Sequence, residues 1–141
     1  MKALVHYHIL LRAAVDNPTA LDLEGLKDWM RRLVTEQGLE PVIGPNAVYV
    51  EDIGNEGPTG SVNIKTSHFA FHIWDNLGIM QADLYTCGEL DVPLFLKAFD
   101  LFKPTTMQYL VLDRQAGFQI LASSEYTRTL NKGVADELYI Y

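Results

Sequence analysis

A serine, a histidine and a cysteine fall at intervals that could build one reactive centre. Ser67 and His72 are five residues apart in a stretch rich in β-forming residues, and Cys87 ends the next such stretch, just before Gly88. A serine hydroxyl can act as a nucleophile, and an imidazole moves protons near neutral pH. An unperturbed thiol is mostly protonated at neutral pH and can serve as an acid. The three residue types could therefore support acyl transfer or proton transfer.

The spacing of these residues constrains how they could meet. In an ideal strand an odd separation places Ser67 and His72 on opposite faces, so direct cooperation requires a kink or bulge between them. An antiparallel hairpin would bring Cys87 near Ser67. Residue types alone leave other interpretations open, because a buried cysteine is often a small apolar residue, and Cys87 with His72 could also form a nucleophilic dyad.

The apolar pattern along the chain predicts two helices among several strands. Helical spacing marks residues 21–38, where Gly38 suits a C-cap, and residues 92–102, where Asp91 suits an N-cap. The sequence GNEGPTG over residues 54–60 is the strongest turn signal. Strands are predicted over 3–14, 40–52 (interrupted near Gly44-Pro45), 61–74, 79–88, 105–114 and 117–123.

This order of elements predicts an α+β fold. Short connections between strand, helix, strands, helix and strands favour a two-layer α/β sandwich, an antiparallel sheet with helices on one face. The other face of such a sheet needs a second layer, which a homodimer supplies most simply. We expect one domain over residues 1–141, in which the tail of residues 124–141 is the hardest segment to place.

The composition excludes several classes of protein. Hydrophobic residues make up 48% of the chain and charged residues 21%, which argues against extensive disorder. The net charge of -7, without a cluster of Lys and Arg, argues against binding to nucleic acid or an anionic membrane. One cysteine excludes an internal disulfide, and no segment approaches the roughly 18 apolar residues of a membrane span. We therefore expect a cytoplasmic protein that binds a small molecule.

Two weaker signals predict no further site. His6 and His8 share a predicted strand face and could contribute to a metal site, but no carboxylate or third histidine lies at supporting spacing. No metal is therefore predicted. The loop of residues 54–60 lacks the Gly-Lys-Ser/Thr ending of a phosphate-binding loop, so a plain turn is expected.

The reactive residues resemble those of the prokaryotic S-adenosylmethionine decarboxylases. That family has a Ser-His dipeptide, then His-x-Trp, then Thr-Cys-Gly at the end of the next strand. The matching residues here are Ser67-His68, His72-Ile73-Trp74 and Thr86-Cys87-Gly88, at the same intervals, and Thr59-Gly60 stands where the family usually has Ser-Gly. The resemblance is specific over residues 54–90, extends loosely to about residue 120, and does not cover the tail.

The resemblance implies a zymogen that cleaves itself between Thr66 and Ser67. Ser67 would attack the carbonyl of Thr66, His72 would assist the β-elimination, and Thr59 would steady the ester-forming geometry. The product would carry a pyruvoyl group derived from Ser67, whose ketone forms a Schiff base with a substrate amine. Cys87 would return a proton to the α-carbon. The implied function is a carboxy-lyase of polyamine and spermidine biosynthesis acting on S-adenosyl-L-methionine.

Departures from the family leave the substrate open. Thr66 replaces the usual Glu before the cleaved serine, and the usual His-Thr-Trp-Pro-Glu becomes residues 72–76, so Asn76 replaces a ribose-binding Glu. Arg12 aligns with a second ribose-binding Glu. Arg12, Trp74, Asp75 and Asn76 are therefore the candidate substrate-binding residues. One alternative is the same chemistry on arginine or ornithine, with Asp75 pairing with a basic side chain. Another is an unprocessed, non-catalytic homologue that acts as a binding or regulatory protein.

Overall fold

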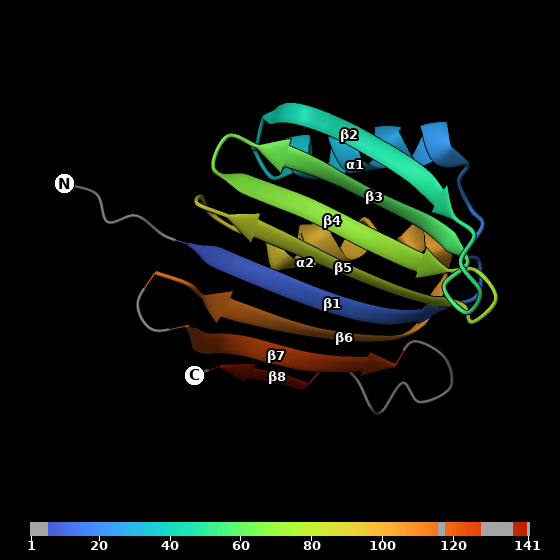
Figure 1. Ribbon diagram of the computed structural model, residues 1–141. Coiled ribbons are helices and arrows are strands. Elements are labelled where there is room, and N and C mark those ends of the chain that lie inside the picture. The colour runs from blue at the N-terminus through green and yellow to red at the C-terminus, as the bar shows by residue number, and fades with distance from the viewer. Residues whose placement is uncertain (1–5, 116–117, 128–136, 141) are drawn as a thin grey trace.

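The computed structural model describes residues 6–115, 118–127 and 137–140, and it shows one antiparallel sheet with both helices on the same side (Figure 1). This confirms the predicted α+β class and two-layer architecture. The elements are β1 (Tyr7–Val15), α1 (Leu23–Glu36), β2 (Pro41–Val50), β3 (Gly57–Ile64), β4 (Ser67–Trp74), β5 (Ile79–Thr86), α2 (Val92–Lys97), a 3-10 turn (Asp100–Phe102), β6 (Pro104–Asp113), β7 (Gln119–Thr127) and β8 (Glu137–Ile140).

The order of the strands places the N-terminal strand in the middle of the sheet. The order is β2-β3-β4-β5-β1-β6-β7-β8, so β1 pairs with β5 on one side and with β6 on the other. Both helices lie behind the sheet in Figure 1, and α1 packs on β2 and β3. The face turned toward the viewer carries no helix. We call it the open face.

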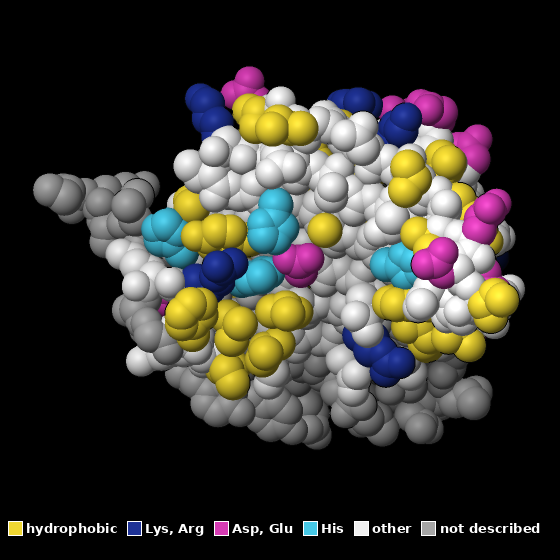
Figure 2. Space-filling view, in the orientation of Figure 1, with side chains coloured by type: hydrophobic (Ala, Val, Ile, Leu, Met, Phe, Trp, Pro, Cys, Tyr) yellow, Lys and Arg dark blue, Asp and Glu magenta, His cyan; other side chains and the backbone are white. Residues whose placement is uncertain are grey.

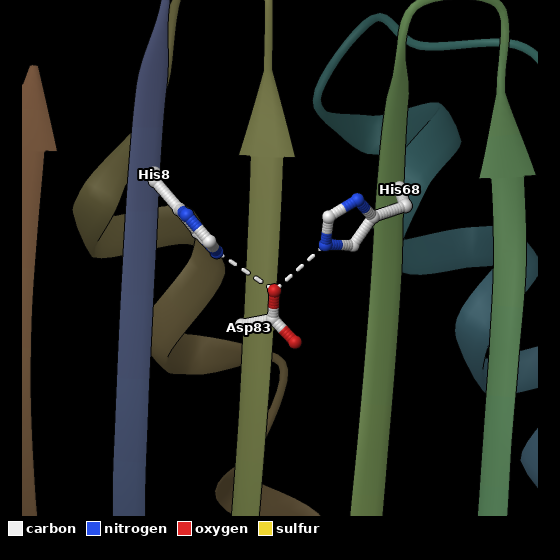
Figure 3. Close-up of side chains that lie close together, drawn as sticks. All are labelled: His8, His68 and Asp83. Carbon is white, nitrogen blue, oxygen red and sulfur yellow. Dashed lines mark hydrogen bonds and ion pairs between the residues drawn. The ribbon is translucent and has the colours of Figure 1, made fainter. Parts of the chain in front are cut away.

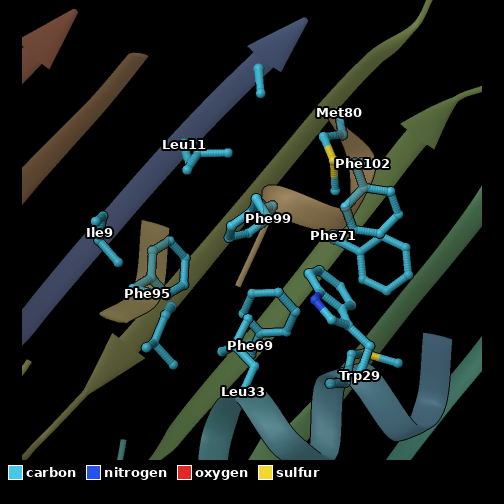
Figure 4. Packing of buried hydrophobic residues seen from close by; sticks show 14 of the residues in the cluster. Ile9, Leu11, Trp29, Leu33, Phe69, Phe71, Met80, Phe95, Phe99 and Phe102 are labelled. Atoms are coloured by element: carbon cyan, nitrogen blue, oxygen red, sulfur yellow. The ribbon is translucent and has the colours of Figure 1, made fainter. Parts of the chain in front are cut away.

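The core lies between the sheet and the helices and is centred on Trp29 of α1 (Figure 4). The indole meets four phenyl rings edge-on, and its Nε1 donates a hydrogen bond of 2.8 Å to the carbonyl oxygen of Ala98. Such edge-to-face pairs stabilise beyond their buried area. The four rings belong to Phe69, Phe71, Phe99 and Phe102. Because Phe69 and Phe71 point into this core, the intervening residues of β4 point to the open face.

The single strand predicted over residues 61–74 is wrong. The structure places a two-residue turn at Lys65 and Thr66, which splits the segment into β3 and β4. The turn contains no Gly, Pro or Asn, and its one trace in the sequence is a change of phase, because the buried apolar residues fall at 62 and 64 before it and at 69, 71 and 73 after it. The Thr66–Ser67 peptide bond therefore lies where a tight hairpin enters β4.

The glycine-rich turn predicted over residues 54–60 is shorter than expected, since β3 begins at Gly57. Gly57 has φ +148°, and a side chain there would collide with the carbonyl oxygen of Ile73. This close approach of two backbones explains the glycine without invoking a ligand.

The predicted caps Asp91 and Gly38 lie at helix ends in the structure, and Asp22, which was not predicted as a cap, begins α1. Asp22 and Asp91 accept hydrogen bonds from the backbone N–H groups of Gly25 and Leu94, at 2.7 and 3.0 Å. Gly38 has φ +77° just after the C-cap of α1. The second helix is shorter than predicted, and the 3-10 turn follows it. Of the tail, β8 pairs with β7, whereas residues 128–136 and 141 lie outside the described residues.

None of the helices in the described part of the chain is long and apolar enough to cross a membrane.

Candidate active site

Ser67 and Cys87 lie together at one end of the sheet. The backbone N–H of Cys87 donates to Ser67 Oγ at 3.2 Å, and its Sγ donates to the carbonyl oxygen of Thr66, also at 3.2 Å. This confirms that the β4–β5 hairpin brings Cys87 near Ser67. One residue thus holds both the hydroxyl oxygen and the carbonyl of the adjoining peptide bond. A donor on a carbonyl oxygen favours negative charge there, which is the requirement of nucleophilic attack at that carbonyl.

Two further side chains surround the thiol of Cys87. His6 Nδ1 lies 3.3 Å from Sγ and 2.8 Å from the hydroxyl of Tyr85, while the Tyr85 hydroxyl lies 3.8 Å from Sγ. Burial raises the pKa of Tyr85, and the hydrogen bond and charge of Cys87 raise it further, against the opposing effect of Arg114. The sequence singled out His6 only as a metal ligand. The contact depends on the pairing of Tyr7 with Thr86, just beyond which His6 and Cys87 follow, and this pairing could not be read from the sequence.

His72 lies at the far end of β4 and does not meet Ser67. The strand alternates without interruption, and its pairing with β3 and β5 has no register shift, so the bulge needed for a direct contact is absent from β4. Five residues of extended strand span about 17 Å. Instead, His72 Nε2 lies 3.1 Å from the carbonyl oxygen of Asn55, and its ring meets Trp74 edge-on, with centroids 4.3 Å apart.

Several candidate residues share one row across the open face. The strand register aligns Thr59 with His72, His72 with Gln81, and Gln81 with Arg12. This row, which we call the His72 row, crosses an open hollow of about 790 Å³. The Thr59 hydroxyl donates to the carbonyl oxygen of Phe71 at 3.1 Å. The hollow is lined by Leu10, Leu11, Arg12, Asn46, Ala47, Val48, Thr59, Gly60, Ser61, Ala70, Phe71, His72, Gln81, Ala82, Asp83, Gln108, Tyr109 and Leu110.

The other three candidate substrate-binding residues do not line this hollow. The Nε1 of Trp74 donates to Asn55 Oδ1 at 3.1 Å, and Asp75 accepts a hydrogen bond of 3.0 Å from the Tyr49 hydroxyl. That hydrogen bond, with smaller effects of burial and nearby carboxylates, raises the pKa of Tyr49. Asn76 is exposed in the following turn. These residues therefore cap the end of the sheet opposite Cys87.

Two histidines and an aspartate from three neighbouring strands meet on the open face (Figure 3), where the aspartate, Asp83, also lines the hollow. His8 Nε2 and His68 Nε2 lie 2.7 and 2.8 Å from the same oxygen, Oδ2 of Asp83. Burial alone would raise the pKa of Asp83, but the hydrogen bonds and charges of the two rings hold it below its ordinary value of 3.8. Spacing along the chain could not predict Asp83 as a partner of His8, because the three residues come from three different strands.

This cluster has the donor types of a metal site, and its ligand atoms lie within 4.8 Å of one another. The guanidinium of Arg114 lies 3.2 Å from Nδ1 of His8 and can only donate there. The proton of a neutral His8 must then lie on Nε2, where it is donated to Asp83. A metal at Nε2 would move that proton to Nδ1, against the Arg114 donors. The arrangement therefore suits a proton-linked network better than a cation.

Asp83→Asn is expected to remove a pH-dependent part of the stability. Because the pKa of Asp83 is lowered by folding, its contribution is complete above about pH 4 and is lost as the pH falls through the lower, folded-state value. The variant should unfold at a lower urea concentration than the parent at pH 6, and the difference should shrink at pH 3. Asp28→Asn, which breaks an exposed pair with Arg31, is the control and should change the midpoint little at either pH. An equal deficit for Asp83→Asn at both pH values would contradict the assignment.

The open face combines these polar residues with exposed apolar ones. Figure 2 shows histidine side chains grouped with an acidic and a basic side chain, with apolar side chains around them. Leu10 and Val48 are 40% and 58% exposed on this face. Exposed apolar residues around a polar centre are typical of surfaces that bind a ligand or another protein.

Comparison with known proteins gives one family. Residues 8–115 match the sequence profile of S-adenosylmethionine decarboxylase. The chain is similar to proteins named S-adenosylmethionine decarboxylase proenzyme from Archaeoglobus fulgidus, 42% identical over 62 residues that cover 41% of this chain and 54% of that relative, and from Picrophilus torridus, 28% identical over 118 residues that cover 74% and 87%. A third, from Acetivibrio thermocellus, is 32% identical over 63 residues, which cover 45% of this chain and 51% of that protein. The chain thus spans about half the length of two of these relatives.

The fold also matches a solved structure. The crystal structure of the adenosylmethionine decarboxylase from Aquifex aeolicus superposes with a TM-score of 0.67 at 19% identity, and it covers 84% of this chain and all of that one. At this identity the likeness concerns the fold alone.

Proposed function

Because the chain belongs to the S-adenosylmethionine decarboxylase family, we propose that it is a self-processing, pyruvoyl-dependent carboxy-lyase acting on S-adenosylmethionine. The observation that carries the proposal is the pair of contacts from Cys87 to Ser67 Oγ and to the Thr66 carbonyl. They hold a nucleophile and its electrophile at one end of the sheet. In a cell, we place the enzyme in the cytoplasm, in polyamine biosynthesis.

In the processing reaction, the Ser67 hydroxyl adds to the Thr66 carbonyl carbon. The thiol of Cys87 stabilises the negative charge that develops on the carbonyl oxygen. The C–N bond then breaks, the amine takes up the hydroxyl proton, and an ester joins the two residues. Elimination of that ester requires a base for the α-proton of residue 67, the role that we assign to His72. The ester C–O bond breaks, Thr66 leaves as a carboxylate, and water replaces the nitrogen of residue 67, which departs as ammonia. Thr66 needs no carboxylate for this reaction, because the reacting atoms belong to its backbone.

The pyruvoyl group made from Ser67 would supply the electrophilic ketone and the electron sink for loss of CO₂. The structure fits such a group, since residue 67 adjoins the thiol that would deliver the final proton. Cys87 gives its proton to the α-carbon of the product and must recover it before the next turnover. Arg12 and the other side chains of the hollow would bind the rest of the substrate.

His72 can take part if a second copy of the chain covers the open face. The middle of the face is the row that contains Ala70 and Asp83. A two-fold axis that lies between the two open faces, parallel to the sheet and running across the strands along that row, would lay the partner's His72 over the end that holds Ser67 and Cys87. The exposed Leu10 and Val48 would become buried in the same contact. We therefore propose a homodimer with two shared active sites, each also receiving Thr59 from the partner.

The hollow favours S-adenosylmethionine over arginine or ornithine. A distal guanidinium or ammonium group requires an available carboxylate. Asp83 is the one carboxylate among the described residues that line the hollow, and it already accepts from His8 and His68. Asp75, the sequence-based candidate for this role, lies outside the hollow.

Intact-mass measurement tests the proposal. The purified protein should give two fragments, residues 1–66 and residues 67–141, the second carrying a pyruvoyl group at its new N-terminus. Release of CO₂ should then be measured with S-adenosylmethionine, arginine and ornithine. A chain that stays uncut would overturn the proposal in favour of a non-catalytic binding protein.

Cys87 variants separate processing from turnover. Cys87→Ser keeps a hydroxyl that can donate to the Thr66 carbonyl, so we expect substantial cleavage but decarboxylation reduced about 10²-fold or more. Cys87→Ala removes the donor and should slow cleavage as well. The measurements are the fraction cleaved over time and the CO₂ released per cleaved chain. Undiminished turnover in Cys87→Ser would remove Cys87 from the mechanism.

A further inference from the structure

His6 touches the thiol of Cys87 but has no part in the reaction described above. It stands just before β1, and its Nδ1 lies 3.3 Å from Cys87 Sγ. The same nitrogen lies 2.8 Å from the Tyr85 hydroxyl, and the two rings stack at 26° with centroids 6.1 Å apart. The His6 carbonyl also accepts from the backbone N–H of Arg114 at 2.8 Å. Tyr85 on one side of His6 and the backbone of Arg114 on the other therefore hold the imidazole against the thiol.

The proposed reaction leaves Cys87 with an unmet requirement. Once the thiol has given its proton to the product carbon, a thiolate remains, and a second turnover needs that proton restored. Among the described residues, the hydrogen-bond partners of Sγ are the side chains of His6 and Tyr85 and the carbonyl of Thr66. The carbonyl of Thr66 has no proton to give. The raised pKa of Tyr85 suits a phenol that keeps its proton.

We propose that His6 is the residue that returns the proton to Cys87, an inference that rests on the proposed function. The imidazolium of His6 gives its Nδ1 proton to the thiolate, which restores the thiol and leaves a neutral imidazole. Solvent then reprotonates His6, so no oxidant or further co-reactant is needed. His6 does not touch the reacting carbon; it is a positioning and proton-supplying residue that acts through Cys87.

The neighbouring histidines cannot take this role. His8 and His68 lie on the same open face, but each directs Nε2 to Asp83, and His8 presents Nδ1 to Arg114. His8 thus offers a matched control: it lies two residues from His6, is also half-buried, and contacts an aspartate instead of the thiol.

Alkylation of the thiol tests the contact without requiring decarboxylation. Cys87 is the only cysteine, so iodoacetamide reports on it alone. His6→Asn keeps an N–H near the thiol but cannot exchange a proton with it near neutral pH. We expect its alkylation rate at pH 7.5 to fall about fivefold or more, and that of His8→Asn to stay within about twofold of the parent. An unchanged rate in His6→Asn, or an equal loss in both variants, would overturn the proposal even in a chain that never cleaves itself.

Turnover separates a proton-supplying role from a structural one. His6→Asn should cleave at residue 67 as the parent does and show kcat lowered about 10²-fold with KM within about twofold. In His6→Ala, added imidazole should restore part of the lost kcat. Normal kcat in His6→Asn would contradict the proposal and leave the proposed function intact. Absence of cleavage and of CO₂ release in the parent chain would instead contradict the proposed function.

Discussion

Ser67→Ala is expected to yield a chain that stays whole indefinitely. The variant lacks the hydroxyl oxygen that adds to the Thr66 carbonyl, and the alanine side chain offers no other nucleophile. Ser67 is 7% exposed, and its Oγ accepts one hydrogen bond from the Cys87 backbone. Alanine fits the same space, so the fold should survive, with about 1 kcal/mol lost for that bond. Intact mass after prolonged incubation should show one species of full length.

The matched control changes Thr66, the residue on the other side of the Thr66–Ser67 peptide bond. Thr66→Ala and Thr66→Glu alter only a side chain in the exposed turn, and both should still cleave, since the backbone carbonyl is unchanged. Thermal unfolding of all three variants would show whether each is folded. Normal fragments from Ser67→Ala would end the assignment of residue 67, whatever the controls do. Loss of cleavage in both Thr66 variants would show that cleavage depends on the threonine side chain and not on the backbone carbonyl alone.

The sequence predicted the layers of the fold because its periodicity is strong. Strand β4 and helix α1 follow clear patterns of period two and 3.6, and β1, β6 and β7 contain runs of β-forming residues. The β3–β4 turn was missed because neither Lys65 nor Thr66 is a residue type that favours turns. The local sign of the turn is instead a change of phase, since the buried apolar positions pass from even numbers before it to odd numbers after it. The turn that was missed is the one that positions the proposed cleavage bond.

The contacts of the candidate site also fall into those that the sequence could predict and those that it could not. The proximity of Ser67 to Cys87 could be predicted, since it depends on one hairpin. The contacts of His6 with Cys87, and of His8 with Asp83, depend on the register of β1 beside β5, two strands far apart in sequence. Register between distant strands is set by the packed core and not by local pattern. For that reason, the sequence predicted candidate reactive residues but not the side chains that surround them.

Because Ser67 and His72 lie far apart in one chain, we expect cleavage to be restored in dimers that combine two different inactive variants. About 17 Å of straight strand separates the two residues within one chain, so in the proposed dimer each residue meets its counterpart on the partner. His72→Ala alone and Ser67→Ala alone should both remain uncut. When the two chains are co-expressed with different tags, a mixed dimer contains one intact site, built from Ser67 of one chain and His72 of the other.

In that mixture the tags identify which chain is cleaved. Only the His72→Ala chain still has Ser67, and random pairing joins about half of these chains to a Ser67→Ala partner. We therefore expect cleavage of about half of the His72→Ala chains and of none of the Ser67→Ala chains. A partner that carries both substitutions is the control and should restore nothing. Cleavage of His72→Ala by itself would show that His72 is dispensable. Failure of the mixture, with mixed dimers demonstrated by tag pull-down, would show that the site is not shared. Recovery in the mixture alone requires two chains at each site, because neither chain contains both residues.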